Sequence, residues 1–471
     1  MHAIVVGAGV GGLGTALALG RAGHRVTVLE RDGFAPLADV EAAFAADRRG
    51  APQVHQTHGF LARLQLLLRE RFPDVFERLL AAGCTTMATT SALGEPRPGD
   101  EDLRVLIVRR TTLDWVLRSA ALEQPGVELR TGVGVAGVVA SPPTTPGDPP
   151  MVTGVRLDDG TTLEADLVVS AGGRRAPVPE WLAAVGVDVP ETIRESGLMY
   201  LSRWYRYPGG PQLLDDPKLG GDLGFVKFLG VPGDGDTLSV TLAIRPDDAE
   251  LRAALSDDDR FDLACRLLPG PSRFFEGAPP EPIGGVRPMG GLLNRLRRFV
   301  DDDGHPSVLG FHAVGDAHTT TNPLYGRGCS LAFVQALHLA DALADHPDDP
   351  VARAAAYEAA AERDIEPWYD NAVEMDRAGA DPTGLGADGQ PTGAAKTFGT
   401  LLVAAQTDPV LGRAMVRFWN LLGTPLEIMG DPDVMAAAAA VLAEPEKYPI
   451  PPREGPTRDE LLAALEAAVH A

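Results

Sequence analysis

Several features are scarce in this sequence of 471 residues, and each scarcity excludes a class of protein. Its three cysteines, Cys84, Cys265 and Cys329, lie too far apart for zinc-ligand spacing, a redox pair or a disulfide framework. We therefore expect reduced thiols, no metal site and a cytoplasmic location. No run of about 18 apolar residues predicts a membrane-spanning helix. The first predicted strand begins almost at Met1, so we expect no signal peptide.

Basic residues are also scarce. The chain has 42 Lys and Arg against 65 Asp and Glu, which gives a formal net charge of −23. A surface of this sign repels nucleic acid and anionic membranes, so we expect neither as a partner. The apolar share of 45% and the charged share of 23% are ordinary for a globular protein. The length favours two or three domains.

A glycine-rich turn follows the first predicted strand. The strand covers residues 3–6, the turn reads Gly7-Ala8-Gly9-Val10-Gly11-Gly12, and a helix is predicted over residues 13–22. In such a turn Gly7 permits the sharp bend, Gly9 lets the backbone approach a pyrophosphate, and Gly12 lets the helix pack on the strand. The free N–H groups at the start of the helix are suited to bind the phosphates.

Glu30 ends the second predicted strand, over residues 25–30, and lies 18 residues after Gly12. A carboxylate at this position accepts hydrogen bonds from ribose hydroxyls and disfavours a 2′-phosphate. The turn and the acid together predict a Rossmann-type dinucleotide site, but they do not distinguish FAD from NAD. The candidate binding residues in this part are Gly7, Gly9, Val10, Gly11, Gly12, Glu30 and Arg31.

The rest of the chain falls into blocks of different periodicity. Helices are predicted over residues 57–71, 111–122 and 330–343, and strands over 127–139, 152–169 and 309–314. Between residues 181 and 300, alternating stretches such as 237–244 predict an antiparallel sheet. Beyond residue 345 the chain is alanine-rich and helical, with a Gly/Pro/Asp loop over 379–396. Thr457 and Glu460 have capping-box spacing before a last helix.

A second motif lies near residue 316. Gly315-Asp316-Ala317-His318 follows an apolar strand, and Asn322-Pro323-Leu324-Tyr325-Gly326-Arg327-Gly328 comes next. These segments resemble the Gly-Asp motif and the adjoining loop of FAD-dependent aromatic hydroxylases and their relatives. The resemblance implies that Asp316, after Gly315, accepts a hydrogen bond from a ribityl hydroxyl of FAD. It also implies that Pro323, Gly326 and Gly328 lie beside the isoalloxazine ring, where N–H groups at a helix start stabilise negative charge on reduced flavin.

Further segments extend this resemblance over about residues 1–345. Arg110-Thr111-Thr112-Leu113 is similar to the Arg-x-x-Leu helix start of the family, which implies that Arg110 approaches the ribityl and phosphate region. The overall pattern is most similar to the polyether-type flavin epoxidases. The segments that carry this similarity are 49–53 with His58, 113–115, 179–182 and 322–326.

The chain departs from the family pattern at residues 171–175, which read Ala-Gly-Gly-Arg-Arg where many hydroxylases have an aspartate. That motif is associated with FAD and with nicotinamide use, so either NAD(P)H or a partner reductase supplies the electrons. The chain also lacks the Trp-x-Trp-x-x-Pro element of flavin halogenases. Its first lysine is Lys218, whereas halogenases have a lysine in the N-terminal third.

The resemblance implies an α/β fold in which a Rossmann-type FAD-binding domain is joined by an antiparallel-sheet substrate domain and a helical C-terminal region. The FAD-binding domain is predicted to be discontinuous, with segments 1–75, 105–180 and 301–345. The substrate domain is assigned to residues 76–104 and 181–300. The C-terminal helical region is assigned to residues 346–471.

We therefore expect an FAD-dependent oxidoreductase, and more narrowly a hydroxylase or epoxidase of secondary metabolism. Such a monooxygenase would transfer oxygen from a flavin C4a-hydroperoxide to a hydrophobic, electron-rich small molecule, with O2 as co-substrate and NAD(P)H as reductant. Two alternatives stay open. One is a flavin-dependent reductase of prenyl double bonds, and the other is a protein that binds FAD without turnover. The sequence names no catalytic acid or base.

Two groups of residues have both a structural and a functional interpretation. Residues 203–207 alternate polar and aromatic side chains, which favours a half-buried strand. The functional alternative is that Trp204 or Tyr205 lines a cavity over the flavin. His55 and His58 have no carboxylate or cysteine to complete a metal set, so a helix-start or flavin-proximal role is expected.

Overall fold

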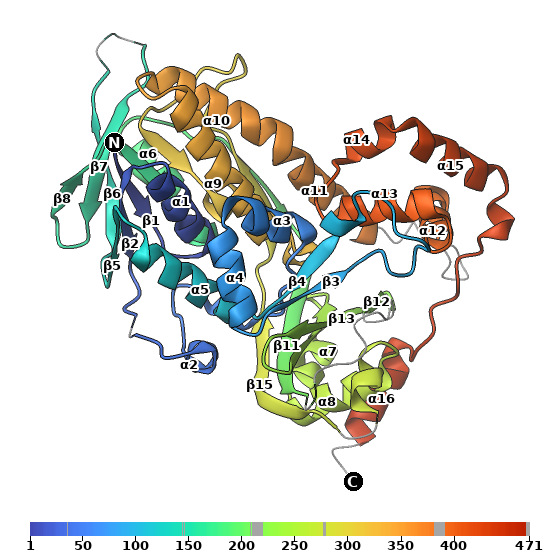
Figure 1. Ribbon diagram of the computed structural model, residues 1–471. Helices are drawn as coiled ribbons and strands as arrows, with labels where there is room; N and C mark the ends of the chain where they lie inside the picture. Colours follow the sequence, from blue (N-terminus) through green and yellow to red (C-terminus); the bar gives the residue numbers. More distant parts are fainter. Residues whose placement is uncertain are drawn as a thin grey trace.

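Five parallel strands, drawn from distant parts of the sequence, form the first large sheet of the protein. Figure 1 labels the strands β1, β2 and β5 of this sheet. The computed structural model describes residues 1–34, 36–143, 145, 147–207, 209, 220–276, 279–380 and 391–467. The sheet has the order β17-β9-β1-β2-β5. Its strands are β1 (His2–Val6), β2 (Arg25–Glu30), β5 (Val127–Thr131), β9 (Leu167–Ser170) and β17 (Phe311–Ala313).

The two faces of this sheet are buried by different elements. Ala3 and Val5 of β1 belong to an apolar cluster with the helices of one face, whereas Ile4 and Val6 belong to a cluster on the other face. This division follows from the alternation of side chains along a strand. The first face is covered by α1 (Val10–Arg21), α3 (Ala62–Arg71), α4 (Pro73–Ala81), α5 (Arg110–Glu123) and α9 (Gly328–Asp345). The second is covered by β6 (Val135–Ser141), β7 (Met151–Leu157), β8 (Thr162–Glu164) and α6 (Val178–Ala183).

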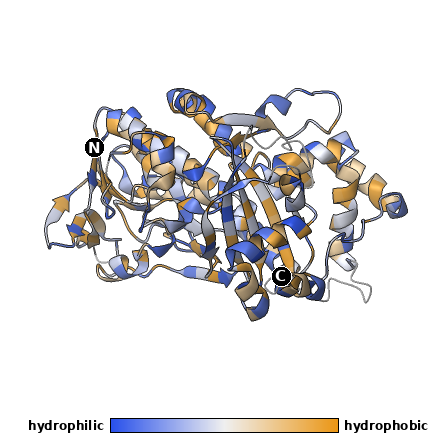
Figure 2. Cartoon of the chain, turned by 90° about the horizontal axis from the view of Figure 1, so that it is seen from below, coloured by the Kyte–Doolittle hydropathy of each residue, from blue (hydrophilic) through white to orange (hydrophobic). Residues whose placement is uncertain are grey.

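A second large sheet is antiparallel and has the order β12-β13-β14-β11-β15. Its strands are β11 (Met199–Arg206), β12 (Gly220–Asp222), β13 (Val226–Gly233), β14 (Thr237–Ile244) and β15 (Glu281–Met289). All of β14 is buried, and Figure 2 shows hydrophobic residues, in orange, on strands near the C-terminal end. One face of this sheet packs on α7 (Ala249–Leu255) and α8 (Asp258–Leu267).

Smaller elements connect the two sheets. The described residues include a hairpin of β3 (Thr85–Ala88) and β4 (Arg104–Ile107), and a three-stranded sheet of β10 (Glu191–Glu195), β16 (Leu293–Arg297) and β18 (Thr319–Thr320). The short helix α2 (Val40–Ala45) lies after β2. Because β16 pairs with β10 and β18, it leads the chain from the antiparallel sheet back toward the motif at residue 316.

Helices dominate the C-terminal part of the chain. They are α10 (Pro350–Asp364), α11 (Glu366–Ala380), α12 (Gly393–Ala405), α13 (Pro409–Trp419), α14 (Pro425–Gly430), α15 (Pro432–Ala443) and α16 (Arg458–Ala467). The last helix separates from the others and lies beside α7 and α8 (Figure 1), where Leu461 and Leu465 are fully buried. Its N-terminus has the predicted capping box, because Thr457 and Glu460 exchange hydrogen bonds.

The predicted fold class is confirmed: the protein combines a parallel sheet, antiparallel sheets and a helical C-terminal region. Some predicted bounds are wrong. The helix predicted over 57–71 begins at Ala62, because Phe60 forms an isolated bridge with Leu106 instead of a helical turn. The segment 127–139 is two strands that join different sheets. In the loop predicted over 379–396, α12 already begins at Gly393, and residues 381–390 lie outside the described residues.

Within the described residues, no helix combines the length and the apolar character needed to cross a bilayer.

Candidate active site

A cavity of about 830 Å³ lies at the carboxyl ends of the five parallel strands. Gly7, Val133, Ala171 and Val314 on its wall closely follow β1, β5, β9 and β17, and Glu30 is the last residue of β2. Ligands of open parallel sheets bind at this edge, outside the carboxyl ends of the strands. The volume is within the range of about 300–1,000 Å³ that is usual for cofactor pockets.

The cavity brings together the two motifs that are about three hundred positions apart in sequence. A Cβ added to Gly11 would lie 3.9 Å from Gly315 Cα, and one added to Gly328 would lie 3.9 Å from Asp316 Oδ1. Of the predicted binding residues, all but Gly12 line the cavity: Gly7, Gly9, Val10, Gly11, Glu30, Arg31, Arg110, Gly315, Asp316, Pro323, Gly326 and Gly328. Their roles toward a cofactor stay predictions.

The three motif glycines differ in what surrounds them. A Cβ on Gly12 would lie 1.9 Å from Gly7 O, so this glycine is needed for the contact between turn and helix. Gly7 has φ +107° and its Cβ would lie 2.6 Å from Ala171 O. By contrast, a Cβ on Gly9 would have no atom within 4 Å. The open space at Gly9 therefore belongs to the cavity, where it leaves room for a ligand to approach the backbone.

The N-terminus of α1 faces this space with Gly9 as its N-cap, and no side chain caps it. Its first N–H groups have no intrahelical partner and carry the positive end of the helix dipole. Nearby, Glu30 accepts hydrogen bonds from the N–H groups of Ala8 at 2.8 Å and Asp32 at 2.9 Å. These bonds fix the orientation of the carboxylate at the end of β2.

Basic residues are concentrated on the cavity wall although the protein as a whole is acidic. Three lining residues are acidic: Glu30, Asp158 and Asp316. Seven are basic: Arg31, Arg48, Arg110, Arg174, Arg175, Lys227 and Arg327. Arg48 and Arg110 pair with Asp114, and Lys227 pairs with Asp222. Arg31, Arg174 and Arg175, which form no ion pair among the described residues, remain to attract an anionic ligand.

Asp316 is half-buried at the cavity wall, and desolvation raises the pKa of its carboxyl group. The positive charges of Arg110, Arg174 and Arg295 act in the opposite direction without cancelling the effect of desolvation. Among the described residues, no hydrogen bond to this carboxylate is found. It is therefore a half-buried acceptor whose partner comes from a ligand or from water.

Arg110 is held rigidly at the start of α5. Its Nε donates to Asp114 Oδ1 at 2.7 Å, and Nη1 donates to Cys329 Sγ at 3.3 Å. Nη1 also lies 3.4 Å from His58 Nε2, while His58 Nδ1 lies 2.9 Å from Gln56 O. Because arginine only donates, these contacts fix the neutral tautomer of His58 with its proton on Nδ1. Burial, aided by the charge of Arg110, lowers the pKa of His58 to about 4.

The loop at residues 322–328 forms another part of the wall. Asn322 caps the short helical turn Pro323–Tyr325 by accepting the N–H of Leu324 at 3.1 Å. Gly326 has φ +67°, and its Cβ would lie 3.1 Å from Gly59 O, so a side chain at this position would be strained. α9 then begins at Gly328 without a side-chain cap, which leaves N–H groups free at the cavity.

Two residues of the antiparallel sheet and residues 56–57 form a row of polar side chains on the cavity wall. Ser202 Oγ donates to Gln56 Oε1 at 2.7 Å and lies 2.6 Å from Thr241 Oγ1, which lies 2.6 Å from Thr57 Oγ1. All four residues line the cavity. Apolar side chains lie beside them on the same wall, namely Phe228, Leu229, Met289 and Leu292.

The functional alternative for residues 203–207 is wrong. Residues 203–206 belong to strand β11, as predicted, but residues 203–205 are all buried, so the strand is not half-buried there. Neither Trp204 nor Tyr205 lines the cavity. Trp204 Nε1 donates to His55 O at 2.7 Å, and the Tyr205 hydroxyl donates to Asp262 at 2.6 Å. The same strand instead exposes Tyr200 and Ser202 to the cavity.

Sequence reasoning missed Tyr200 and the polar row because no motif marks them. The alternation along β11 could have paired Tyr200 with Ser202 on one face, but it does not tell which face meets a cavity. Of the two histidines considered, His58 lines the cavity, whereas His55 does not and lies 3.2 Å from Ala46 O.

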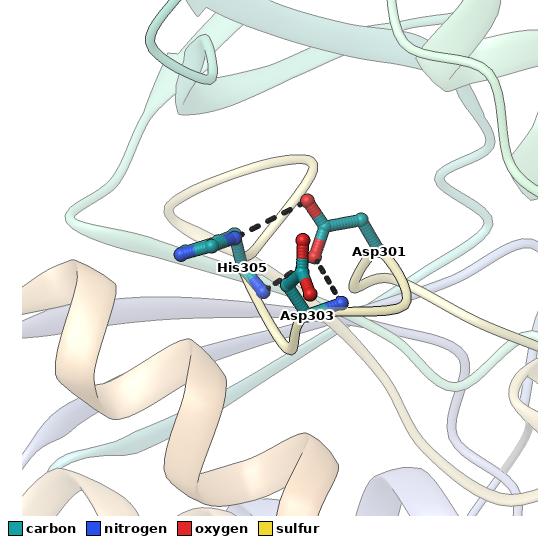
Figure 3. A group of neighbouring side chains, drawn as sticks. All are labelled: Asp301, Asp303 and His305. Atoms are coloured by element: carbon teal, nitrogen blue, oxygen red, sulfur yellow. Dashed lines mark hydrogen bonds and ion pairs between the residues drawn. The ribbon is translucent and has the colours of Figure 1, made fainter.

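An acidic group lies away from this cavity, on an exposed turn. Asp301, Asp303 and His305 bring three possible metal-ligand atoms within 4.8 Å of one another (Figure 3). The Asp301 carboxylate already accepts the N–H groups of Asp303 at 3.0 Å and His305 at 2.8 Å. These bonds explain the cluster as a hydrogen-bonded turn, and we assign it no ligand.

The chain is similar in sequence or in fold to known proteins. Residues 2–90 match a family model described as FAD dependent oxidoreductase. No curated protein sequence matches the chain. Solved structures are similar in fold, and the p-nitrophenol 4-monooxygenase PnpA of Pseudomonas putida DLL-E4 is one of them. It is 18% identical with a TM-score of 0.61, and the match covers 89% of this chain and 98% of that one.

Two further flavoproteins resemble the structure. PqsL of Pseudomonas aeruginosa, described as a probable FAD-dependent monooxygenase, is 18% identical with a TM-score of 0.55, over 80% of this chain and 95% of that one. The flavin-dependent brominase Bmp2 is 16% identical with a TM-score of 0.58, over 95% of this chain and 100% of that one. At such identities the likeness concerns the fold. The first 90 residues thus match the FAD dependent oxidoreductases, and the chain as a whole has the fold of FAD-binding flavoproteins.

Proposed function

We propose that the protein binds FAD in the 830 Å³ cavity and acts as a monooxygenase on a hydrophobic, electron-rich small molecule. One observation carries the proposal: residues of the glycine turn at 7–12 and of the Gly-Asp motif at 315–316 line the same cavity. The N-terminus of α1 would bind the pyrophosphate, and Glu30 would accept from the adenosine ribose. Asp316 would accept from a ribityl hydroxyl, and the loop 322–328 would lie along the flavin ring.

The residues present fit this cofactor. Gly9 leaves the backbone open to an approaching phosphate, and the basic residues of the wall match its negative charge. Asp316 is a half-buried acceptor without a protein partner among the described residues, and a sugar-alcohol hydroxyl would supply the donor that it lacks. The free N–H groups at Gly328 suit the anionic edge of reduced flavin.

When bound, FAD supplies the redox chemistry and the activation of O2. The protein's own residues would orient the substrate and exclude water. The row from Gln56 to Thr57 offers hydroxyl and amide groups to a polar substituent of the substrate, and Phe228 and Met289 offer apolar contact to its hydrocarbon part. The electrons would come from NAD(P)H or from a partner reductase.

Oxygen labelling tests this proposal. The reduced holoprotein is mixed with ¹⁸O₂ and candidate substrates, and the products are analysed by mass spectrometry. We expect one ¹⁸O atom in the product, with no label when only the water is labelled. Label from water alone would exclude a monooxygenase.

A parallel reaction without O2, run beside the labelled one, separates the alternatives. Anaerobic turnover with net loss of a double bond would indicate a prenyl reductase. Reoxidation of the flavin without any product would indicate a protein that binds FAD without turnover.

A further inference from the structure

One carboxylate links the C-terminal helices to the loop 322–328. Asp376, on α11, accepts hydrogen bonds on Oδ1 from Asn322 Nδ2 at 2.8 Å and from the Tyr325 hydroxyl at 2.7 Å. Its Oδ2 accepts from Asn294 Nδ2 at 2.7 Å. Asp376 does not line the cavity itself. It therefore joins α11, β16 and the loop from behind the cavity wall.

Asn322 links Asp376 to two residues of the cavity wall. Its side chain is fully buried, and its Oδ1 accepts from the hydroxyl of Tyr200 and from the N–H of Leu324. An amide has one accepting and one donating end, so the carboxylate of Asp376 on Nδ2 determines that Oδ1 turns toward Tyr200. Tyr200 and Leu324 both line the cavity. The orientation of two wall residues thus depends on Asp376.

Arg327 connects the same loop to the C-terminal helices a second time. Its guanidinium is fully buried, 4.9 Å from the ring centres of Tyr325 and Trp368 and 5.8 Å from that of Phe418. It donates to Trp368 O at 3.2 Å and to Asn371 Oδ1 at 2.7 Å. Two helices of the C-terminal region, α11 and α13, therefore enclose the side chain that follows Gly326.

The two residues that join the loop 322–328 to the C-terminal helices carry opposite charges: Asp376 is negative and Arg327 is positive. Burial lowers the pKa of Arg327 to about 10, against the effects of Tyr325 and Asp376, so the guanidinium stays protonated at neutral pH. Among the described residues, no carboxylate forms a salt bridge with Arg327. Its positive charge is stabilised by the surrounding rings and by neutral acceptors. Asp376 is the acidic group that opposes it.

We propose that Asp376 is a positioning residue for the flavin: by holding Asn322 and Tyr325 it fixes the loop 322–328 against the isoalloxazine ring. This inference rests on the proposed function, because it requires FAD in the cavity. The fixed loop would hold the free N–H groups at its end, where α9 begins, in place for the flavin without reorganisation. The C-terminal helical region is then a part of the redox site, although its sequence contains no motif that indicates such a role.

The test uses Asp376→Ala and Asp376→Asn in the full chain, with Asp370→Asn as the matched control on the exposed side of the same helix. Alanine leaves three donors without an acceptor, so we expect the dissociation constant of FAD to rise about tenfold. The visible circular dichroism of the bound flavin should change as well. Asparagine keeps one acceptor and should restore part of the affinity, and Asp370→Asn should leave both properties unchanged.

The midpoint potential of the bound FAD provides a readout that a purely structural role would not move. Asp376→Asn removes one negative charge beside the loop, so the potential should rise relative to the parent protein. The charge removed in Asp370→Asn is exposed and screened by solvent, so no rise is expected there. If Asp376→Ala folds poorly, the nearly isosteric asparagine variant carries the test.

The outcomes distinguish this inference from the proposed function. A parent protein that does not bind FAD would overturn both. A parent protein that binds FAD, with Asp376 variants of unchanged affinity, dichroism and potential, would overturn the role of Asp376 alone.

Discussion

At the scale of single residues, two carboxylates of the cavity differ in how well the protein satisfies them. Glu30 accepts two backbone N–H groups and is held at the end of β2. Asp316 accepts no hydrogen bond from the described residues and is half-buried, and desolvation raises its pKa. A partly desolvated charge without such bonds costs stability until it meets a donor. The ligand-binding role proposed for Asp316 would therefore come at the expense of stability.

Asp316→Asn is expected to raise the melting temperature of the FAD-free protein at neutral pH. Because the native pKa is raised, the native state binds the proton more tightly than the unfolded chain. Stability therefore falls as the pH rises from the ordinary aspartate pKa through the raised one, and the whole cost is present above it. The gain from asparagine should be seen by thermal unfolding at pH 7 and should shrink toward pH 4.

The control for this change is Asp302→Asn, at an exposed position with no such burial. An Asp316→Asn protein no more stable than this control at pH 7 would contradict the assignment of Asp316 as a partly desolvated acceptor without a hydrogen bond. Asp316→Ala should also weaken FAD binding by about tenfold, because a hydrogen bond to a charged acceptor is lost.

At the scale of elements, two glycines at the start of α1 have different roles. Gly12 is required by packing, because its Cβ would meet Gly7 O at 1.9 Å. Gly9 has φ −83° and ψ −175°, an extended conformation that any residue adopts, and its Cβ would meet nothing. Gly12 is therefore needed for stability, whereas Gly9 leaves an open space at the helix start.

Gly9→Ala is expected to leave the free energy of unfolding within about 0.5 kcal/mol of the parent value. It should nevertheless weaken FAD binding at least about tenfold, because a methyl group would occupy the space of the pyrophosphate. Denaturant unfolding and flavin titration measure the two effects separately.

Gly12→Ala is the comparison. It should lower stability by several kcal/mol or prevent folding, because the backbone at Gly7 cannot move away from the added methyl group. Equal FAD affinity of Gly9→Ala and the parent protein would show that the space at Gly9 is not used by the ligand.

The elements near the N-terminus could be predicted from sequence because their rules are local. The turn before α1 and the acid at the end of β2 follow from glycine geometry and strand spacing. The polar row that includes Ser202 and Thr241 could not be predicted, because it depends on which face of the antiparallel sheet meets the cavity. The role of Asp376 could not be predicted either, because it contacts Asn322 across 54 residues of sequence and lies in a helix without a motif.

At the scale of the whole molecule, the site lies where separate parts of the fold meet. The parallel sheet supplies the glycine turn and Asp316, and the antiparallel sheet supplies the polar row. The C-terminal helices support the loop 322–328 through Asp376 and Arg327. Positive charge collects on the cavity wall of an otherwise acidic protein. All these features lead to a single claim: two distant motifs bind one FAD.

The amount of flavin bound per chain tests this claim most directly. The purified protein is denatured, and the released flavin is identified by its absorption spectrum and by chromatography against FAD and FMN. We predict about one FAD per chain for the parent protein, and a clear loss in both Gly9→Ala and Asp316→Ala. A folded parent protein that contains no FAD, and takes up none when FAD is added, would contradict the account.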